Sequence, residues 1–453
     1  MEWESSIYLS GSRRFIDVFR FALRDRKETG MSAFDRIIGY ESLKVEMMMI
    51  CDSMKNPERY RELGVTVPKG VMLHGEPGIG KSLMAKAMIE ESGRINFTLR
   101  KDKPDGEFVN EIREVFEQAK SNAPSIVFLD DMDKFTNGDE DHKDAEEFVT
   151  VQTCIENAKG VDLFVLATAN DISVLPESLI RPGRFDKSIR MTCPTGEDAE
   201  KIVKHFLEQK KISDDIDFTE VAHILDGESC AALETIVNDA GMYAAFERKD
   251  RISHNDIIRA CLRHIFNVPE EIVPLNESEK RIVAIHEAGH AVAAEILDHG
   301  SVNIVSIVGR SKTLSGVTSI SLPKGYWDSK ELMEHRVIGI LGGRAATEIV
   351  RGVIDMGSHN DISRAFRIVE RFVERFCTTG FETFERGEAS ETVKEIRDRG
   401  IVSEIERYYR MANKVILENK EFLNELVDLL MLKTTVTGKE VRGIKERLMK
   451  DTA

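Results

Sequence analysis

This sequence of 453 residues lacks a long apolar run and a secretion signal, and each absence excludes a class of protein. A segment that crosses a bilayer needs ~20 consecutive apolar residues, whereas the most apolar stretches here, such as Ile126–Leu129 and Leu163–Ala167, are far shorter. The N-terminal Met-Glu-Trp-Glu is not a basic region followed by an apolar stretch, which argues against export. We therefore expect a cytoplasmic protein without a transmembrane anchor.

Paired cysteines and an excess of positive charge are also missing. The six cysteines show no C-x-x-C pair and no disulfide-like spacing, which fits a reducing compartment. The chain has 63 Lys and Arg residues against 79 Asp and Glu residues, a formal net charge of -16. This balance gives no electrostatic basis for gripping nucleic acid or an anionic membrane. Nucleic acid is therefore not an expected partner.

The chain is too long for one ordinary hydrophobic core, and its patterns divide it into parts. Strand-like runs alternating with helical patterns predict a parallel sheet flanked by helices, and an almost entirely helical stretch follows. Two prolines in Asn267–Pro274 mark a boundary, after which the pattern is helix-rich apart from strand-like runs at 302–307 and 316–320. We predict an N-terminal helical segment at 1–33, an α/β subdomain at 34–196, a helical lid at 197–270 and a mainly α-helical domain at 275–450.

The N-terminal segment contains one short amphipathic pattern, Phe15–Leu23, flanked by arginines. Such a pattern fits a helix that packs on its own domain, and it also fits a helix that touches a membrane surface or a partner. We favour the packing helix and keep peripheral membrane contact as the weaker alternative.

A phosphate-binding motif follows the first strand-like run, Val71–Leu73, and precedes a helical pattern. In the motif G-x-x-x-x-G-K-[ST], glycines let backbone N–H groups point at phosphate oxygens, and the helix N-terminus adds the positive end of a dipole. We expect Lys81 to reach the outer phosphates of ATP and Ser82 to bind Mg²⁺. The predicted loop comprises Gly75, Glu76, Pro77, Gly78, Ile79, Gly80, Lys81 and Ser82.

Acidic residues end a second buried strand. The run Ser125–Leu129 is followed by Asp130 and Asp131. A carboxylate at the end of a buried strand, beside a phosphate loop, is what Mg²⁺ coordination requires. Acidic turns are common, so this signal is modest alone, but together with the upstream loop it predicts a site for ATP and Mg²⁺ that includes Asp130.

The run His286-Glu287-Ala288-Gly289-His290 satisfies H-E-x-x-H within a segment of helical periodicity, Ile282–Leu297. Histidines four residues apart lie one turn apart on one face of a helix, so both can bind one metal ion, and the adjacent glutamate can deprotonate a water. Chance matches to so short a motif occur, but the small residues inside it and its apolar flanks favour a metal site. The motif predicts the chemistry of a zinc peptidase.

Zinc in a hydrolase uses a third protein ligand and keeps one position open. On chemistry alone, the downstream candidates are Asp355, His359 and Asp361. The spacing of these residues does not choose among them.

The order of the phosphate loop, the acidic strand end, Arg181-Pro182-Gly183-Arg184-Phe185-Asp186 and the H-E-x-x-H motif resembles the FtsH family of AAA+ zinc metalloproteases, of the M41 type. Further segments similar to that family are Asn56–Tyr60, Phe116–Lys120, Glu279–Ile282 and Gly342–Ala346. The resemblance runs from about Phe34 to about Leu448. It implies an AAA+ module of α/β subdomain and helical lid, followed by a mainly α-helical metalloprotease domain. It also implies self-association into a ring, normally a hexamer, that acts on protein substrates.

The resemblance implies roles for single residues at the nucleotide. Asn170 falls where the family senses the terminal phosphate, and Arg181 and Arg184 match the fingers that reach the nucleotide of a neighbouring subunit. The positions that match the adenine pocket are Ile38, Gly39 and His205.

In the peptidase domain, the resemblance assigns His286 and His290 as zinc ligands and Glu287 as the catalytic base. It assigns Asp361 as the third ligand and leaves His359 as a weaker rival.

Three features depart from the family pattern. Members of the family typically carry an N-terminal membrane anchor, and we expect this chain to be a soluble member that lacks one. The family has aspartate followed by glutamate at the strand end, but here Asp130 is followed by Asp131, which is one methylene shorter. Displacing a catalytic group by about 1 Å can cost on the order of 10²-fold in rate, so we expect ATP to bind and to be hydrolysed slowly. The aromatic-hydrophobic-glycine triplet of the substrate-gripping loop is also missing. Phe108-Val109 is its nearest equivalent, and burial of Phe108 in the core is an equal alternative.

The sequence therefore predicts an ATP-dependent zinc metalloendopeptidase. Asp131 and the altered gripping segment leave two alternatives open. One is a remodelling ATPase switched by nucleotide, and the other is a zinc peptidase for unfolded substrates without strong unfolding activity.

Overall fold

A computed structural model of the chain describes residues 32–102, 105–136, 145–266, 275–308, 316–321, 329–354, 356–384 and 390–451. The pattern at Phe15–Leu23 and the linker at 267–274 lie outside the described residues. The chain divides into two compact units: the first runs to Lys210 and includes Gly227–Val237, and the second comprises Lys211–Asp226 and the chain from Asn238 onwards. This division passes through the stretch predicted as a lid, so the domain boundaries stay predictions.

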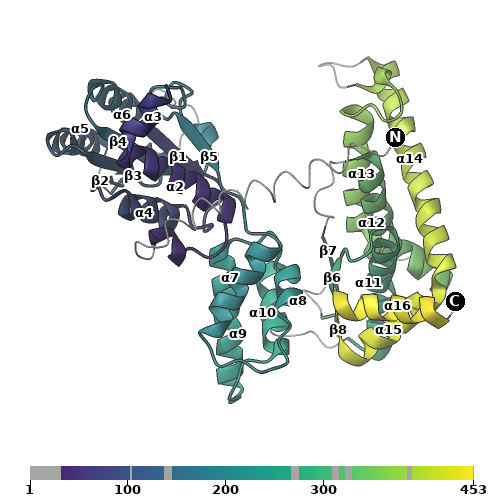
Figure 1. Cartoon of the computed structure of the whole chain (residues 1–453). Helices are drawn as coiled ribbons and strands as arrows, with labels where there is room; N and C mark the ends of the chain where they lie inside the picture. The colour runs from purple at the N-terminus through teal and green to yellow at the C-terminus, as the bar shows by residue number, and fades with distance from the viewer. Residues whose placement is uncertain are drawn as a thin grey trace. The chain divides into compact units, whose positions relative to one another are not determined.

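The first unit is built around a five-stranded parallel sheet with the strand order β2-β3-β4-β1-β5 (Figure 1). Its strands are β1 (Gly70–His74), β2 (Ile95–Leu99), β3 (Ser125–Leu129), β4 (Leu163–Ala169) and β5 (Lys187–Arg190). Its helices are α2 (Glu41–Lys55), α3 (Pro57–Glu62), α4 (Lys81–Ser92), α5 (Asp105–Ser121), α6 (Glu146–Asn157) and α7 (Glu197–Glu208). Short 3-10 turns are η1 (Ala33–Arg36), η2 (Met132–Lys134) and η3 (Ile172–Val174). The predicted α/β architecture is confirmed.

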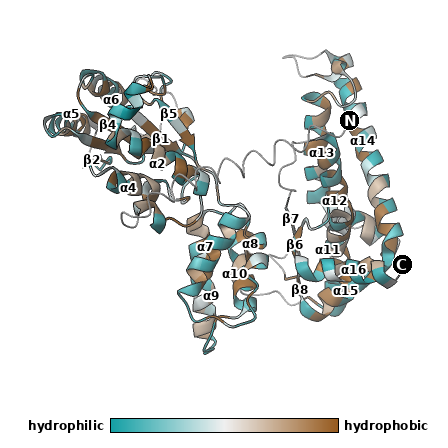
Figure 2. Cartoon of the chain, viewed as in Figure 1, coloured by the Kyte–Doolittle hydropathy of each residue, from teal (hydrophilic) through white to brown (hydrophobic). Residues whose placement is uncertain are grey.

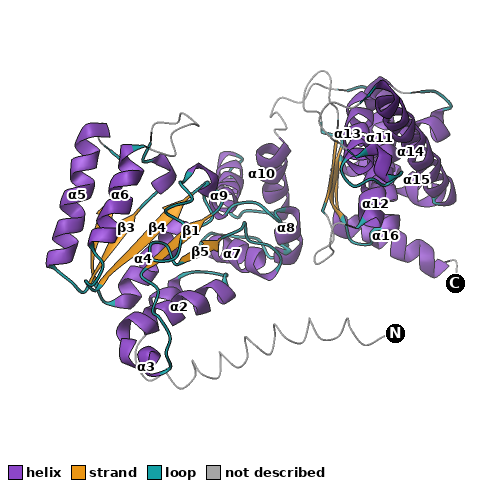
Figure 3. Cartoon of the chain, turned by 90° about the horizontal axis from the view of Figure 1, so that it is seen from above, coloured by secondary structure: helices purple, strands orange, loops and turns teal. Residues whose placement is uncertain are grey.

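Side chains that alternate along the central strands give this sheet two apolar faces. In β3, Ile126 and Phe128 pack with residues of α2 and α4, whereas Val127 and Leu129 pack with residues of α5 and α6. Figure 3 shows these two helix pairs on opposite sides of the sheet. Burial on both faces explains why the central strands are continuous apolar runs.

Phe108 belongs to the core of this unit. It lies in α5, is fully buried, and packs edge-on against Phe135 with ring centroids 4.9 Å apart. Of the two interpretations of Phe108, the structure supports burial in the core over a role in gripping substrate.

The second unit is mainly helical, as predicted, with a small antiparallel sheet of order β7-β6-β8. Its helices are α8 (Phe218–Ile224), α10 (His254–Phe266), α11 (Glu277–Leu297), α12 (Lys330–Arg351), α13 (His359–Glu374), α14 (Glu391–Glu418), α15 (Lys420–Lys433) and α16 (Gly438–Asp451), together with the end of α9 (Cys230–Phe246), which begins in the first unit. The strands are β6 (Val302–Ser306), β7 (Val317–Ile320) and β8 (Thr435–Thr437), and the 3-10 turns are η4 (Met356–Ser358) and η5 (Phe381–Thr383).

The helices of both units alternate hydrophobic and hydrophilic residues, as expected for helices with one buried face (Figure 2). None of the helices in the described part of the chain is both long enough and apolar enough to cross a membrane.

Helices α11 and α12 form the centre of the second unit. A capping box starts α11, because the Glu279 backbone N–H donates to the Asn276 side chain and the Asn276 backbone N–H donates to the Glu279 side chain. Further along, the backbones of α11 and α12 meet at Gly289 and Gly342. A Cβ added at Gly289 would lie 2.4 Å from the Gly342 carbonyl oxygen and 2.5 Å from the Cβ of Ala346. Only glycine permits so close an approach.

We predict that Gly289→Ala destabilises the second unit by about 1–3 kcal/mol, because the extra methyl group overpacks the helix contact. Gly339→Ala is the matched control, since a Cβ there would meet only the Cβ of Ala294, at 3.9 Å. Thermal unfolding followed by circular dichroism should show a lower midpoint for Gly289→Ala and an equal or higher midpoint for Gly339→Ala. Equal midpoints for the two variants would contradict the close contact.

Candidate functional site

The predicted phosphate loop joins β1 to α4 in the first unit. β1 and its neighbour β4, and β3 beyond it, are parallel, so the segments that follow them meet at one edge of the sheet. Gly78 and Gly80 have φ angles of 78° and 92°, a backbone region that favours glycine. The loop therefore leads into the N-terminus of α4 in the manner that suits bound phosphate.

Lys81 is held across this loop. Its Nζ donates to the carbonyl oxygens of Gly75 at 2.7 Å and Glu76 at 2.6 Å, and to Oδ1 of Asn170 at 2.9 Å. Burial lowers the pKa of the Lys81 ammonium, and nearby carboxylates, chiefly Asp131, oppose that shift. The predicted phosphate-binding lysine and the predicted phosphate sensor thus lie side by side.

Asp133 orients the amide of Asn170. The backbone N–H of Asn170 donates to Asp133 Oδ1 at 2.9 Å, and its Nδ2 donates to Oδ2 at 3.1 Å. With Nδ2 occupied in this way, Oδ1 of Asn170 faces Lys81. Asp133 stands in the same acidic run as Asp130, but no spacing in the sequence marks its role.

Asp130 and Ser82 form the pair expected at a magnesium site. Ser82 Oγ donates to Asp130 Oδ1 at 2.9 Å, and Thr168 Oγ1 donates to the same oxygen at 2.8 Å. Hydroxyl and carboxylate oxygens are the ligands that Mg²⁺ prefers, so these residues fit the ion. Thr168 was missed from the sequence. The only sequence feature that could have indicated Thr168 is its hydroxyl near the end of β4, a strand that is otherwise apolar.

The carboxylate of Asp131 forms ion pairs with two cationic side chains. The residue has a left-handed backbone with φ of 54°. Its Oδ2 accepts a hydrogen bond from Lys134 Nζ at 2.8 Å and lies 3.5 Å from Arg100 Nη2. Neither cation was predicted as a partner, because neither belongs to the motif.

The two predicted arginine fingers differ in their surroundings. Arg184 is half-buried and contacts Glu156 and the carbonyl oxygen of Ser178 within its own unit, whereas Arg181 is exposed.

Of the residues predicted to line the adenine pocket, Gly39 lies beside the start of α7 and His205 lies within it. Ile38 is half-buried, and Gly39 has a φ of 73°. A Cβ at Gly39 would lie 3.2 Å from Asp198 at the start of α7. His205, further along α7, is exposed, and its Nε2 lies 2.9 Å from Gln209 Nε2.

The predicted zinc ligands converge in the second unit. His286 and His290 project from one face of α11, and their Nε2 atoms lie 3.1 Å apart. Asp361, in the first turn of α13, brings its Oδ2 to 3.0 Å from His286 Nε2 and 3.4 Å from His290 Nε2. The three ligand atoms lie within 4.8 Å of one another. Two imidazole nitrogens and one carboxylate oxygen are a donor set that fits zinc.

Helix α12 fixes the orientation of His290. The Nδ1 of His290 lies 2.9 Å from the Gly339 carbonyl oxygen, which can only accept, and 3.3 Å from the Gly343 backbone nitrogen. A proton on Nδ1 satisfies the shorter contact and leaves Nε2 available as a ligand. A Cβ at Gly343 would lie 2.5 Å from His290 Nε2. The bare backbone of α12 thus makes room for the imidazole. In the sequence, the Gly342-Gly343 pair was informative only as part of the family resemblance.

The pKa shifts of these groups show how strongly the cluster attracts positive charge. Burial alone would lower the pKa of His290, but the hydrogen bond and negative charge of Asp361 outweigh it and raise the pKa to about 9. Burial would raise the pKa of Asp361, but its hydrogen bonds to His286 and His290 hold the pKa well below its usual range. A divalent cation would compete with protons for the histidine nitrogens and the Asp361 carboxylate.

The other proposed third ligands do not join this cluster. His359 is the first residue of α13 and is exposed, and Asp355 lies outside the described residues. Among the described residues, the structure therefore brings Asp361, and not His359, to the two histidines.

Glu287 is buried next to the ligands, with 7% of its surface exposed. Its Oε2 accepts a hydrogen bond from Thr318 Oγ1 at 2.6 Å. Thr318 lies in β7, and the sequence analysis had marked that segment only as strand-like.

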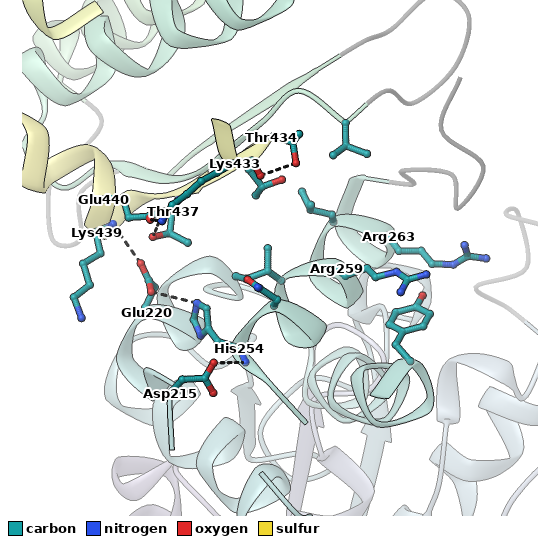
Figure 4. Close-up of a pocket in the computed structure, with 16 residues that line it drawn as sticks. Asp215, Glu220, His254, Arg259, Arg263, Lys433, Thr434, Thr437, Lys439 and Glu440 are labelled. Atoms are coloured by element: carbon teal, nitrogen blue, oxygen red, sulfur yellow. Dashed lines mark hydrogen bonds and ion pairs between the residues drawn. The ribbon is translucent and has the colours of Figure 1, made fainter. Parts of the chain in front are cut away.

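A cavity of ≈ 740 Å³ in the second unit holds neither of these sites (Figure 4). Several of its charged lining residues are already paired. His254 Nε2 lies 3.4 Å from Glu220, whose hydrogen bond raises the pKa of His254, and the Lys439 backbone N–H also donates to Glu220. The cavity contains none of the residues predicted from the sequence.

Comparisons with known proteins match both units. The model of peptidase family M41 matches residues 273–444, and that of the ATPase family associated with various cellular activities (AAA) matches residues 71–193. ATP-dependent zinc metalloprotease FtsH 3 of Petrotoga mobilis is 33% identical over an alignment that covers 94% of this chain and 70% of the relative. FtsH 1 of Methylacidiphilum infernorum is 32% identical over 93% of this chain and 71% of the relative. FtsH of Thermus thermophilus is 31% identical over 92% and 70%.

We predict that Asp361→Asn lowers the affinity for zinc by at least about 100-fold, because losing a ligand costs more than losing the partner of a ligand. His359→Asn should keep the affinity of the unsubstituted protein. Elemental analysis after dialysis against a zinc buffer measures both. A zinc-replete Asp361→Asn protein, or a zinc-depleted His359→Asn protein, would show that the third ligand is assigned wrongly.

Proposed function

Because the chain belongs to the FtsH family of ATP-dependent zinc metalloproteases, we propose that it cleaves polypeptides at a zinc site built from His286, His290 and Asp361. The protein is a metalloprotease with ATPase activity, and its cofactors are Zn²⁺, ATP and Mg²⁺. The observation that carries the residue assignment is the convergence of three ligand atoms beside Glu287.

In the proposed mechanism, Glu287 is the general base. Zinc at the three ligands supplies the Lewis acidity that peptide hydrolysis needs. The carboxylate of Glu287 takes the proton of the attacking water and returns it to the leaving amine. The contact between His290 Nδ1 and the Gly339 carbonyl oxygen supports the assignment of His290 as a ligand, because it keeps His290 Nε2 pointed at the ligand cluster.

At the nucleotide, we propose that Lys81 binds the outer phosphates, that Ser82 and Asp130 hold Mg²⁺, and that Asn170 senses the terminal phosphate. Their hydrogen bonds with one another support this grouping. The adenine would lie against Ile38, Gly39 and His205.

We propose further that the chain works as a ring, normally a hexamer, that delivers protein substrates to the peptidase. Arg181 is the better candidate to reach a neighbouring subunit, because it is exposed whereas Arg184 is paired within its own unit.

We also propose that ATP turnover is slow because Asp131 positions water poorly. Its side chain is one methylene shorter than glutamate, and its carboxylate is drawn toward Lys134 and Arg100. Both effects would move the Asp131 carboxylate away from the attacking water, although a general base must lie within hydrogen-bond distance of that water.

A second candidate function is a peptidase for unfolded chains with weak unfolding activity. The burial of Phe108 favours it, since the nearest match to the gripping aromatic belongs to the core. Equal cleavage of an unfolded chain with ATP and with a non-hydrolysable analogue would support this candidate. Strict dependence on ATP hydrolysis would exclude it.

We predict that Glu287→Gln lowers kcat for a loosely folded substrate by roughly 10²- to 10⁴-fold, the usual contribution of a general base. Zinc content and ATP turnover should stay unchanged, because Glu287 is assigned neither as a zinc ligand nor to the nucleotide site. The measurement is cleavage by zinc-loaded protein in the presence of ATP. Unchanged cleavage would remove the proposed mechanism.

We predict that Asp131→Glu raises ATP turnover by about 10- to 100-fold, since a longer side chain brings the carboxylate to the water. Asp131→Gln is the matched control, because glutamine has the length of glutamate but cannot accept the proton. The ATP turnover of Asp131→Gln should not rise. Steady-state phosphate release measures all three proteins. Equal turnover of the unsubstituted protein and Asp131→Glu would show that Asp131 already positions water well.

A further inference from the structure

Strand β7 brings one hydroxyl to the carboxylate of Glu287. β7 is an outer strand of the small sheet and pairs with β6, where Thr318 lies opposite Val305. From this position, Thr318 Oγ1 donates to Glu287 Oε2 at 2.6 Å and lies 3.1 Å from the Glu287 carbonyl oxygen. So short a hydrogen bond to a carboxylate is of the strong, charge-assisted kind.

The surroundings of Glu287 make this bond important for the orientation of its side chain. The residue is only 7% exposed, and a buried carboxylate needs hydrogen-bond partners because it has lost water. Within the described part of the chain, Thr318 is the one side chain that donates to this carboxylate. Removing its hydroxyl would leave the carboxylate free to turn.

Gly316 directly precedes β7 and also faces Glu287. Residues two apart in a strand point to the same side, so position 316 also faces Glu287. A Cβ at Gly316 would lie 2.6 Å from Glu287 Oε1 and 2.6 Å from its Cγ. The missing side chain leaves space beside Oε1, while Thr318 holds Oε2.

We propose that Thr318 is a positioning residue for the peptidase reaction: its hydroxyl fixes one oxygen of Glu287 and leaves the other oxygen to carry the proton. This inference rests on the proposed role of Glu287 as general base. It adds a residue from outside the H-E-x-x-H motif. The orientation of the base is then set by the outer strand of a sheet as well as by the helix that carries the zinc ligands.

The kinetic test compares two substitutions that differ in the hydroxyl. Thr318→Val keeps the shape and removes the donor, and it should lower kcat by about 10- to 100-fold with little change in KM, because the lost interaction acts on the reacting group. Thr318→Ser keeps the donor and should restore most of the rate. Ser319→Ala is the control in the same strand, since Ser319 lies on the opposite face and contacts Asn303 at 3.3 Å.

The outcomes separate this inference from the proposed function. If Glu287→Gln is inactive while Thr318→Val keeps the full kcat, the positioning role is wrong and the base assignment stands. A Thr318→Ser protein as slow as Thr318→Val would also overturn the inference. Unchanged cleavage by Glu287→Gln would overturn the base assignment itself.

Hydrogen exchange of the full, zinc-loaded chain gives a readout that does not depend on activity or on folding of Thr318→Val. Glu287→Ala removes the side-chain acceptor of the Thr318 hydroxyl and leaves only the backbone carbonyl oxygen at 3.1 Å, whereas Glu287→Gln keeps a side-chain oxygen there. Exchange in residues 316–320 should therefore be faster in Glu287→Ala than in Glu287→Gln. Equal exchange in the two variants would mean that β7 and Glu287 are not coupled, and would overturn the inference.

Discussion

The peptidase site depends on the backbone contact between α11 and α12. At Gly289 and Gly342 the two helices meet without side chains between them, so α12 lies close enough for the Gly339 carbonyl oxygen to bond His290 Nδ1. The same spacing leaves the imidazole of His290 beside the bare backbone of Gly343. A wider separation would break the bond that fixes the ligand nitrogen. The orientation of His290, a proposed metal ligand, is therefore set by glycines of α12, which contribute backbone and no side chain.

The central strands of the sheet could be predicted from the sequence, and its edges could not. The apolar runs Val71–Leu73, Ser125–Leu129 and Leu163–Ala167 lie in β1, β3 and β4, because strands covered on both faces are continuous apolar runs. β2 and β5 lie at the edges of the sheet and are partly exposed. Their sequences, INFTL and KSIR, mix polar and apolar residues, so no local pattern distinguishes them from loops.

In the proposed metal site, too, residues close together in the sequence could be predicted, and a residue far along the chain could not. His286, Glu287 and His290 are one turn of one helix, so their spacing alone predicted that they act together. The third ligand could not be chosen by spacing. Its choice rested on a resemblance, and the structure brings Asp361 to the two imidazoles through the packing of α13.

The residues that the sequence analysis missed came from other strands and turns. Thr168, Asp133 and Thr318 each contact a predicted site residue. Thr168 and Thr318 lie outside any motif, and Asp133 stands in the acidic run of Asp130 without a spacing that marks its role. A hydroxyl in an apolar strand or an acid in a turn is common in many proteins. Only the fold shows which of them face a motif residue.

The ligand cluster also has a consequence for how the second unit holds together. His286 and Asp361 are separated by 75 positions along the chain. A metal ion bound by both residues would therefore be a reversible cross-link that closes a long loop. Closing such a loop restricts the unfolded chain far more than the folded one, and binding to the folded form adds to its stability. A zinc ion held there would then stabilise the folded second unit in addition to any part in catalysis.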